Sequence, residues 1–142
     1  TVEGIISGPS EYEIMRTNSI AKKNRAIQTK LEKVISYTKQ TMVAYMSEED
    51  LNRLCTYVAE YSSGDTLQKI TPVKVDSQLK SIDIMHFGWN IGKAFGIKRI
   101  HTATFIKNVF AHTLRDLEIS TIERKMSHTE SECYIKLQQL KE

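Results

Sequence analysis

The chain has 142 residues, enough for one domain with a substantial core, and its formal net charge is +3. Two prolines and six glycines are too few for a many-turned β protein, and no apolar run reaches the roughly 18–20 residues that would span a bilayer. The small basic excess permits an anionic partner but does not require one.

The first part of the chain predicts an irregular arm followed by two helices. The arm covers residues 1–9, lacks the features of a signal peptide, and breaks at Gly8-Pro9. Ser10 to Glu13 match a capping box, which predicts a helix from about 10 to 22. Apolar residues at three- and four-residue steps predict an amphipathic helix from Asn24 to Met46. The basic residues off this stripe and just upstream could form a phosphate-binding surface, but an ordinary solvated helix face is the favoured interpretation: Arg16, Lys22, Lys23, Arg25, Lys30, Lys33 and Lys39.

A third helix is predicted from Ser47 to Ser62. Ser47 precedes three acidic residues that complement the positive end of a helix dipole, and Gly64 suits the left-handed position after a helix. We expect the tyrosines near this helix to pack at the rim of the core with solvated hydroxyls: Tyr45, Tyr57 and Tyr61. Residues 65–78 form a connector, and Asp76 or Ser77 is expected to cap the next helix.

Residues 79–95 predict a helix that is apolar around most of its circumference and therefore central to the core. Gly88, Gly92 and Gly96 recur every four residues, which favours close approach of another helix. One narrow polar line is expected to reach solvent: Asp83, His86, Asn90 and Lys93. A catalytic interpretation of this line lacks a nucleophile, a pocket or a metal partner, so a solvated stripe is favoured. No catalytic residue, metal site or cofactor is predicted, since no His or Cys pair has a common ligand spacing.

After Gly96 the sequence predicts a basic turn and an amphipathic helix over 102–117 with Thr102 as its N-cap. A helix, a glycine turn and a second helix with a polar-basic outer face resemble a helix-turn-helix. Such a face can contact phosphates or bases. The predicted nucleic-acid-binding residues are Lys98, Arg99, Thr104, Lys107, Asn108 and Arg115. The more common explanation of such a pair is an αα-hairpin inside a bundle with no nucleic-acid role, and the long turn favours it.

The tail predicts a short helical turn near Ser120 and a terminal helix from Thr129, because both positions open capping boxes. Tyr134, Leu137 and Leu140 would face inward along the terminal helix, and the same narrow seam suggests a homodimer through it. A disulfide between the two cysteines, Cys55 and Cys133, cannot be deduced from the sequence. Two reduced thiols in a cytosolic protein are the favoured interpretation.

The stretch FGWNIGKAFGI, followed by TATFIKNVFAHTLRDLEISTI, resembles small helical proteins encoded on conjugative and mobilisable elements of the Bacteroidota. It is also similar to the C-terminal part of the RteC-type regulators of conjugative-transposon excision. The resemblance covers roughly residues 79–122 and rests on Trp-Asn-Ile-Gly and Phe-Gly-Ile. It implies a mobile-element accessory or regulatory role and a cytoplasmic location, and it assigns no site residues.

The sequence thus predicts an all-α protein, a compact single-domain bundle of five to six helices over residues 1–142 with helix 79–95 at its centre. The leading functional hypothesis is a non-enzymatic DNA-associated accessory or regulatory protein of a mobile element, acting through the helix-turn-helix-like pair. The alternative is a helical protein-interaction or self-association domain without a nucleic-acid role.

Overall fold

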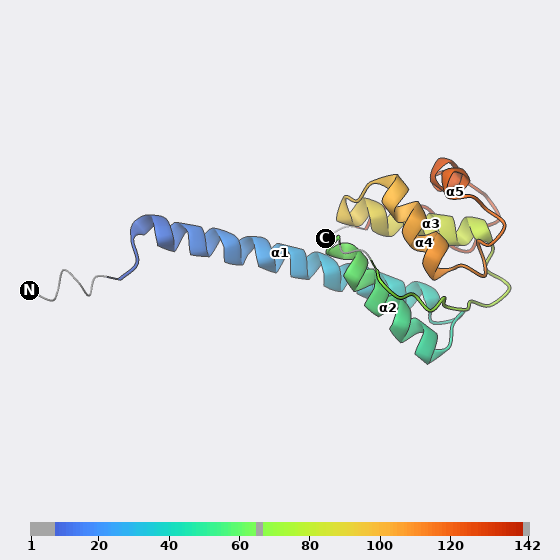
Figure 1. The fold of residues 1–142 in the computed structure, drawn as a ribbon, viewed down its shortest axis with the longest axis horizontal. Coiled ribbons are helices and arrows are strands. Elements are labelled where there is room, and N and C mark those ends of the chain that lie inside the picture. Colours follow the sequence, from blue (N-terminus) through green and yellow to red (C-terminus); the bar gives the residue numbers. More distant parts are fainter. Residues whose placement is uncertain (1–7, 65–66, 141–142) are drawn as a thin grey trace, which may run out of the picture.

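The computed structural model describes residues 8–64 and 67–140, which contain five α-helices and no strand (Figure 1). The all-α expectation is therefore confirmed. In Figure 1 the later helices gather into a rounded body, while the N-terminal half of α1 projects from it. Most of the predicted irregular arm, residues 1–7, lies outside the described residues. The helices are α1 (Glu11–Met42), α2 (Glu48–Ser62), α3 (Ser81–Phe95), α4 (Arg99–Val109) and α5 (Ile119–Lys125).

α1 is one continuous helix where the sequence predicted two. Its N-cap is as expected: the Ser10 hydroxyl accepts the Glu13 N–H at 3.1 Å. No glycine or proline interrupts the chain near residue 23, so the helix has no reason to end there. Residues 11–29 are exposed except for the half-buried Ala21, and burial begins only in the second half of the helix. The first half of α1 is therefore a projecting arm, and the second half belongs to the core.

Both ends of α2 follow the local signals. The Ser47 hydroxyl accepts the Asp50 N–H at 3.2 Å, and Gly64 has the left-handed φ of 82°. The expectation of solvated tyrosine hydroxyls is wrong for two of the three, because Tyr57 and Tyr61 are 7% and 5% exposed. The connector and α4 supply partners that a local pattern cannot reveal. Tyr57 accepts the Thr71 N–H at 2.9 Å, and the Tyr61 hydroxyl is hydrogen-bonded to that of Thr102.

α3 lies at the centre of the core, as predicted. Ile84, Phe87 and Ile91 are fully buried on it. The predicted caps are wrong, since the helix begins after Lys80, whose N–H donates to the Asp83 carboxylate at 2.9 Å. Asp83 is the third residue of α3 and accepts the N–H of the N-cap residue, as the acidic residue of a capping box does.

The C-terminal segment is not the predicted helix. Residues 128–140 contain no helix and run in an irregular, mostly extended path. Side chains alternate along it: Cys133 and Ile135 are buried and Leu137 is half-buried, whereas Tyr134 and Lys136 are exposed. This period of two is that of an extended chain. The inward helical seam on which the homodimer expectation rested is therefore absent.

Candidate nucleic-acid interface

α3 and α4 are joined by a three-residue turn, shorter than the sequence suggested. Gly96 ends α3 with φ 70°, Ile97 follows, and Lys98 is the N-cap of α4. The Ile97 N–H donates back to the Gly92 carbonyl at 3.0 Å, which closes the turn. The predicted N-cap role of Thr102 is wrong, because Thr102 lies one turn inside α4 and is 1% exposed. Three residues is the turn length typical of a helix-turn-helix.

The glycines of α3 mark its crossing with α4, as predicted. A Cβ added to Gly88 would lie 2.9 Å from two methyl carbons of Ile106. At Gly92 it would lie 2.6 Å from the Thr102 hydroxyl oxygen and 3.1 Å from that of Tyr61. Side chains larger than hydrogen do not fit at these separations, so the two helices pack in contact through their glycine face.

α4 ends at Val109, whereas the sequence predicted a helix to residue 117. A series of turns follows α4. The Lys107 ammonium stabilises these turns, because Nζ donates to the carbonyls of Leu114, Arg115 and Leu117 at 2.8, 3.2 and 2.6 Å. The apolar stripe that suggested a longer helix is real, since Leu114 is fully buried. Leu114 reaches the core from these turns instead of from a helix, and the Lys107 ammonium is the hydrogen-bond donor for the carbonyl groups of the turns.

The outer surface of α4 is open on one side only. α5 packs against α4, and Ala103 and Ile106 are fully buried. Ile100, His101 and Asn108 remain exposed. Any contact between α4 and a partner must therefore use this open strip, which begins at the first turn of α4 and contains Ile100, His101 and Asn108.

The six predicted nucleic-acid-binding residues fall into two groups. Arg99 and Lys107 stabilise the fold. Arg99 donates to the Ser127 hydroxyl at 3.0 Å and to the Glu123 carbonyl, and Lys107 donates to the three carbonyls of the turns after α4. The side chains on or beside the open strip are Lys98, Thr104, Asn108 and Arg115. Within this group the Thr104 hydroxyl donates to its own helix, and Arg115 lies 3.9 Å from Asp116.

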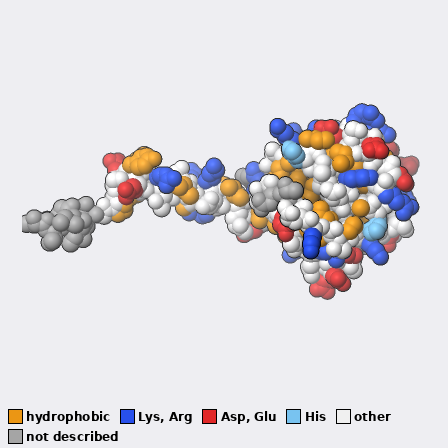
Figure 2. Space-filling model, in the orientation of Figure 1, with side chains coloured by type: hydrophobic (Ala, Val, Ile, Leu, Met, Phe, Trp, Pro, Cys, Tyr) orange, Lys and Arg blue, Asp and Glu red, His pale blue; other side chains and the backbone are white. Residues whose placement is uncertain are grey.

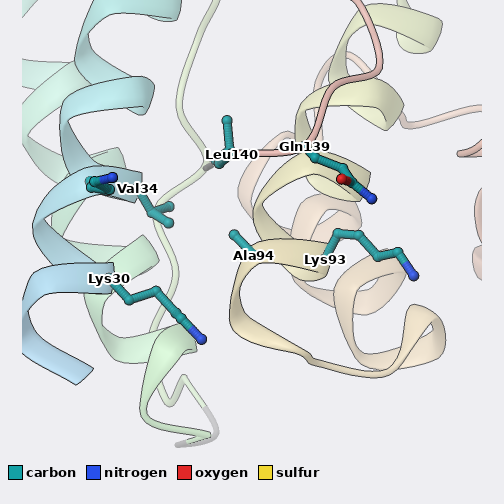
Figure 3. Close-up of a pocket in the computed structure, with 7 residues that line it drawn as sticks. Lys30, Val34, Lys93, Ala94, Gln139 and Leu140 are labelled. Atoms are coloured by element: carbon teal, nitrogen blue, oxygen red, sulfur yellow. The ribbon is translucent and has the colours of Figure 1, made fainter. Parts of the chain in front are cut away.

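Two pockets beside the turn carry basic side chains that the sequence did not bring together. The first, about 300 Å³, is lined by Lys30 and Lys33 of α1 and by Lys93 of α3. Figure 3 shows Lys30 and Lys93 on opposite sides of it. The second, about 350 Å³, shares Lys93 and adds Lys98 and Arg99. Neither lining includes Asp or Glu. Because α1 and α3 are distant in sequence, no spacing rule indicates this basic surface.

The polar line of α3 is buried, so the expectation of a solvated stripe is wrong for three of its four residues. Asp83, His86 and Asn90 are at most 1% exposed. One Asp83 oxygen accepts the N–H groups of Tyr134 and Ile135 at 2.7 and 3.0 Å. The carboxylate thus fixes the backbone of the C-terminal segment where a helix was expected.

His86 and Asn90 continue the same attachment. The two His86 ring nitrogens lie 2.8 Å from the Ile135 carbonyl and 2.6 Å from that of His128, and both carbonyls can only accept hydrogen bonds. The Asn90 amide donates to the Lys136 carbonyl and accepts the Gln138 N–H, both at 2.8 Å. These groups bind the chain's own backbone, which gives the line a structural role and leaves it no open site for a substrate.

The remaining reactive groups suggest no further chemistry. Within residues 8–64 and 67–140, no three His, Cys, Asp or Glu side chains gather as a metal would need. Cys55 and Cys133 are free thiols, and burial raises the pKa of Cys55. Burial also raises the pKa of Tyr61 to about 12. None of the described helices has the length and apolarity needed to cross a membrane.

Comparisons with family models, with curated proteins and with solved structures found no match to this chain.

Proposed function

We propose that the protein binds duplex DNA through α3 and α4 as a non-enzymatic accessory or regulatory protein of a mobile element. The observation that carries the proposal is the three-residue turn from Gly96 to Lys98, which sets α4 against α3 with its first turn exposed. In a helix-turn-helix, the N-terminal residues of the second helix contact base edges in the major groove. The mobile-element role rests on the resemblance of residues 79–122.

The chemistry of the exposed strip suits this use. Lys98 stands at the N-cap of α4, where the helix dipole also favours an anion. His101 and Asn108 can each make hydrogen bonds to base edges, and Ile100 is 40% exposed and can contact a thymine methyl group. Lys93 and Lys98 together line the adjacent pocket and supply charge for phosphates. Phosphate contacts would position α4, and its exposed strip would supply any base preference.

A titration with matched charge reversals tests the proposal. Binding of a fluorescent mixed-sequence duplex is followed by anisotropy from low to physiological salt for wild type, Lys98→Glu and Lys74→Glu. Lys74 is an exposed lysine of the connector and lines none of the basic pockets described above, so it is the control. We expect Lys98→Glu to weaken binding about tenfold or more near 0.1 M salt, since each phosphate contact contributes about 0.9 to the salt slope.

The proposal fails if the wild-type protein does not bind the duplex even at low salt. It also fails if Lys98→Glu binds as Lys74→Glu does. Arg99 and Lys107 are unsuitable for charge reversal because both are bonded to backbone carbonyls, so their loss would disturb the fold.

A second candidate, a protein-interaction or self-association domain, is favoured by the apolar side chains on the arm. Tyr12, Met15 and Ile27 are 69%, 61% and 57% exposed. If two copies associate through these side chains, replacing Tyr12 and Met15 by Ser will convert a larger species to a monomer in light scattering. A wild-type protein that is monomeric at every concentration contradicts self-association.

A further inference from the structure

The projecting half of α1 is a helix without a partner. Residues 11–29 make up a rod of about 28 Å at the usual rise of about 1.5 Å per residue, and only Ala21 among them is even half-buried. Most helical stability in proteins comes from tertiary packing, which these residues lack. The arm therefore has the properties of an element that gains stability from something outside the chain.

Charge indicates the class of partner. Residues 11–29 carry four Lys or Arg residues and two acids, Glu11 and Glu13, and both acids lie in the first turn of α1. Figure 2 shows blue side chains along the projecting part of the molecule. A second copy of the same arm would bring like charges together, which is unfavourable. A dense anion is the complementary partner.

Three of the basic side chains form a line along one face of α1. Arg16, Lys23 and Lys30 are seven residues apart, so they return to nearly the same side of the helix after every two turns. At 100° per residue, Lys33 lies about 60° from Lys30 and Lys22 about 100° from Lys23, whereas Arg25 and Lys39 lie on the opposite side of the helix. The exposed apolar residues Tyr12, Ile20 and Ile27 lie on the same side as this basic line, whereas a helix that lies in a membrane surface needs its apolar and basic residues on opposite faces. This pattern favours a nucleic-acid backbone over a lipid surface.

The basic face of the arm continues into the pockets beside the α3–α4 turn. Lys23 and Lys30 line a pocket of about 520 Å³ at the base of the arm, where α1 meets Phe95 at the end of α3. Lys30 also lines the pocket shared with Lys93, and Lys93 lines the one shared with Lys98. The pocket at the base of the arm also has no Asp or Glu in its lining. The basic surface is thus continuous from the arm to the first turn of α4.

We propose that the arm of α1 is a second DNA-contacting element, which lies along the phosphates of the duplex beside the segment that α4 contacts. This inference rests on the proposed DNA binding and adds the arm to its surface. At about 3.4 Å per base pair, a 28 Å arm tracks roughly eight base pairs. It contributes affinity without base preference, since phosphate contacts carry no sequence information.

The experiment uses the full chain and two triple variants with the same change in charge. The arm variant is Arg16→Gln, Lys22→Gln, Lys23→Gln, and all three positions are exposed. The control variant is Lys69→Gln, Lys74→Gln, Lys125→Gln, which are exposed and line none of the three basic pockets. Each variant is titrated with the mixed-sequence duplex over a range of salt.

We expect the arm variant to flatten the salt slope by about 2.7, from about 0.9 for each of three contacts, and to bind roughly 100-fold or more weakly near 0.1 M salt. The control variant should stay within a few-fold of wild type. Hydrogen exchange in peptides from 11–29 should slow when duplex is added, because a helix without tertiary contacts opens readily when free.

The two proposals can fail separately. If wild type binds and Lys98→Glu weakens binding, but the arm variant matches its control, the arm is not a contact and only this inference is overturned. Unchanged exchange in residues 11–29, or tighter binding to vesicles with anionic lipid than to the duplex at equal salt, also overturns it. If wild type does not bind the duplex at any salt concentration, both the proposed function and this inference are contradicted.

Discussion

Gly92 in α3 lies so close to Thr102 in α4 that a methyl group on its Cα would stand 2.6 Å from the threonine hydroxyl. Thr102 cannot easily move away, because it is 1% exposed and its hydroxyl is bonded to that of Tyr61. This contact sets the distance between the two helices on which the proposed interface depends.

Gly92→Ala should therefore destabilise the protein. Overpacking at a closed helix crossing typically costs about 1–3 kcal/mol, more than the gain in helix propensity from Gly to Ala. Urea unfolding measures the change. Gly8→Ala is the control, since nothing lies within 4 Å of a Cβ at Gly8. Equal unfolding midpoints for the two variants would show that α3 and α4 can separate without cost.

Asp83→Asn should release the C-terminal segment with little change in side-chain volume. Asp83 accepts three backbone N–H groups, from Lys80, Tyr134 and Ile135. An asparagine has one acceptor oxygen, so in either orientation its amino group would face an N–H donor. An unsatisfied buried group costs about 1–3 kcal/mol. Hydrogen exchange at residues 134–138 should become faster, and exchange at the wild-type rate would contradict the proposed attachment.

Lys107→Met should lower the free energy of unfolding by about 1–3 kcal/mol, because three carbonyl groups lose their donor. Lys98→Met provides the comparison on the same helix, since Lys98 is exposed at the N-cap. We expect Lys98→Met to unfold at nearly the wild-type urea concentration. The opposite order of stabilities would mean that Lys107 is dispensable for the turns after α4.

Tyr61 should ionise at a higher pH than a free tyrosine side chain. Its pKa is raised to about 12, chiefly by burial, above the value of about 10 for a free tyrosine side chain. Tyrosinate absorbance of wild type and Tyr61→Phe isolates this group. Its loss should remove a component that titrates near pH 12, and removal of one near pH 10 would contradict the burial.

The same shift makes stability depend on alkaline pH. Tyr61 binds its proton more tightly in the folded protein, so its contribution is fully present below about pH 10. It is lost as pH rises through about 12, and a shift of about two units corresponds to roughly 2–3 kcal/mol. Urea unfolding between pH 9 and 12 should show a steeper decline for wild type than for Tyr61→Phe.

Local signals in the sequence predicted local structure well. The Ser47 cap, the left-handed Gly64 and the buried helix around Phe87 all follow from neighbouring residues. The boundary near residue 23 was wrong because a change in periodicity was interpreted as a break, although the chain contains no helix breaker there.

The errors concern partners that are distant in sequence. Thr102 was predicted as an N-cap, but its hydroxyl packs against Gly92 and is hydrogen-bonded to Tyr61. Asp83 and Asn90 are polar on an apolar helix because they bind backbone groups about fifty residues later. The terminal helix was predicted from the capping box of Thr129 and Glu132. The alternation of buried and exposed side chains from Cys133 to Leu137, which is typical of an extended segment, was not recognised.

The pocket that Lys30 and Lys93 share could not be predicted either, since it depends on how α1 and α3 pack. Composition gave only a small basic excess. The structure concentrates that excess around the base of the arm and the α3–α4 turn, which is why the proposed interface is larger than the helix-turn-helix-like pair alone.

The most direct test of DNA binding through α3 and α4 is a titration of the isotope-labelled protein with a mixed-sequence duplex, followed by amide chemical shifts at low salt. We expect the largest changes from Ile97 to Thr104, with smaller ones along the open strip to Asn108. Amides of α2 should change little. Spectra that do not change, or changes confined to segments away from the turn, would contradict it.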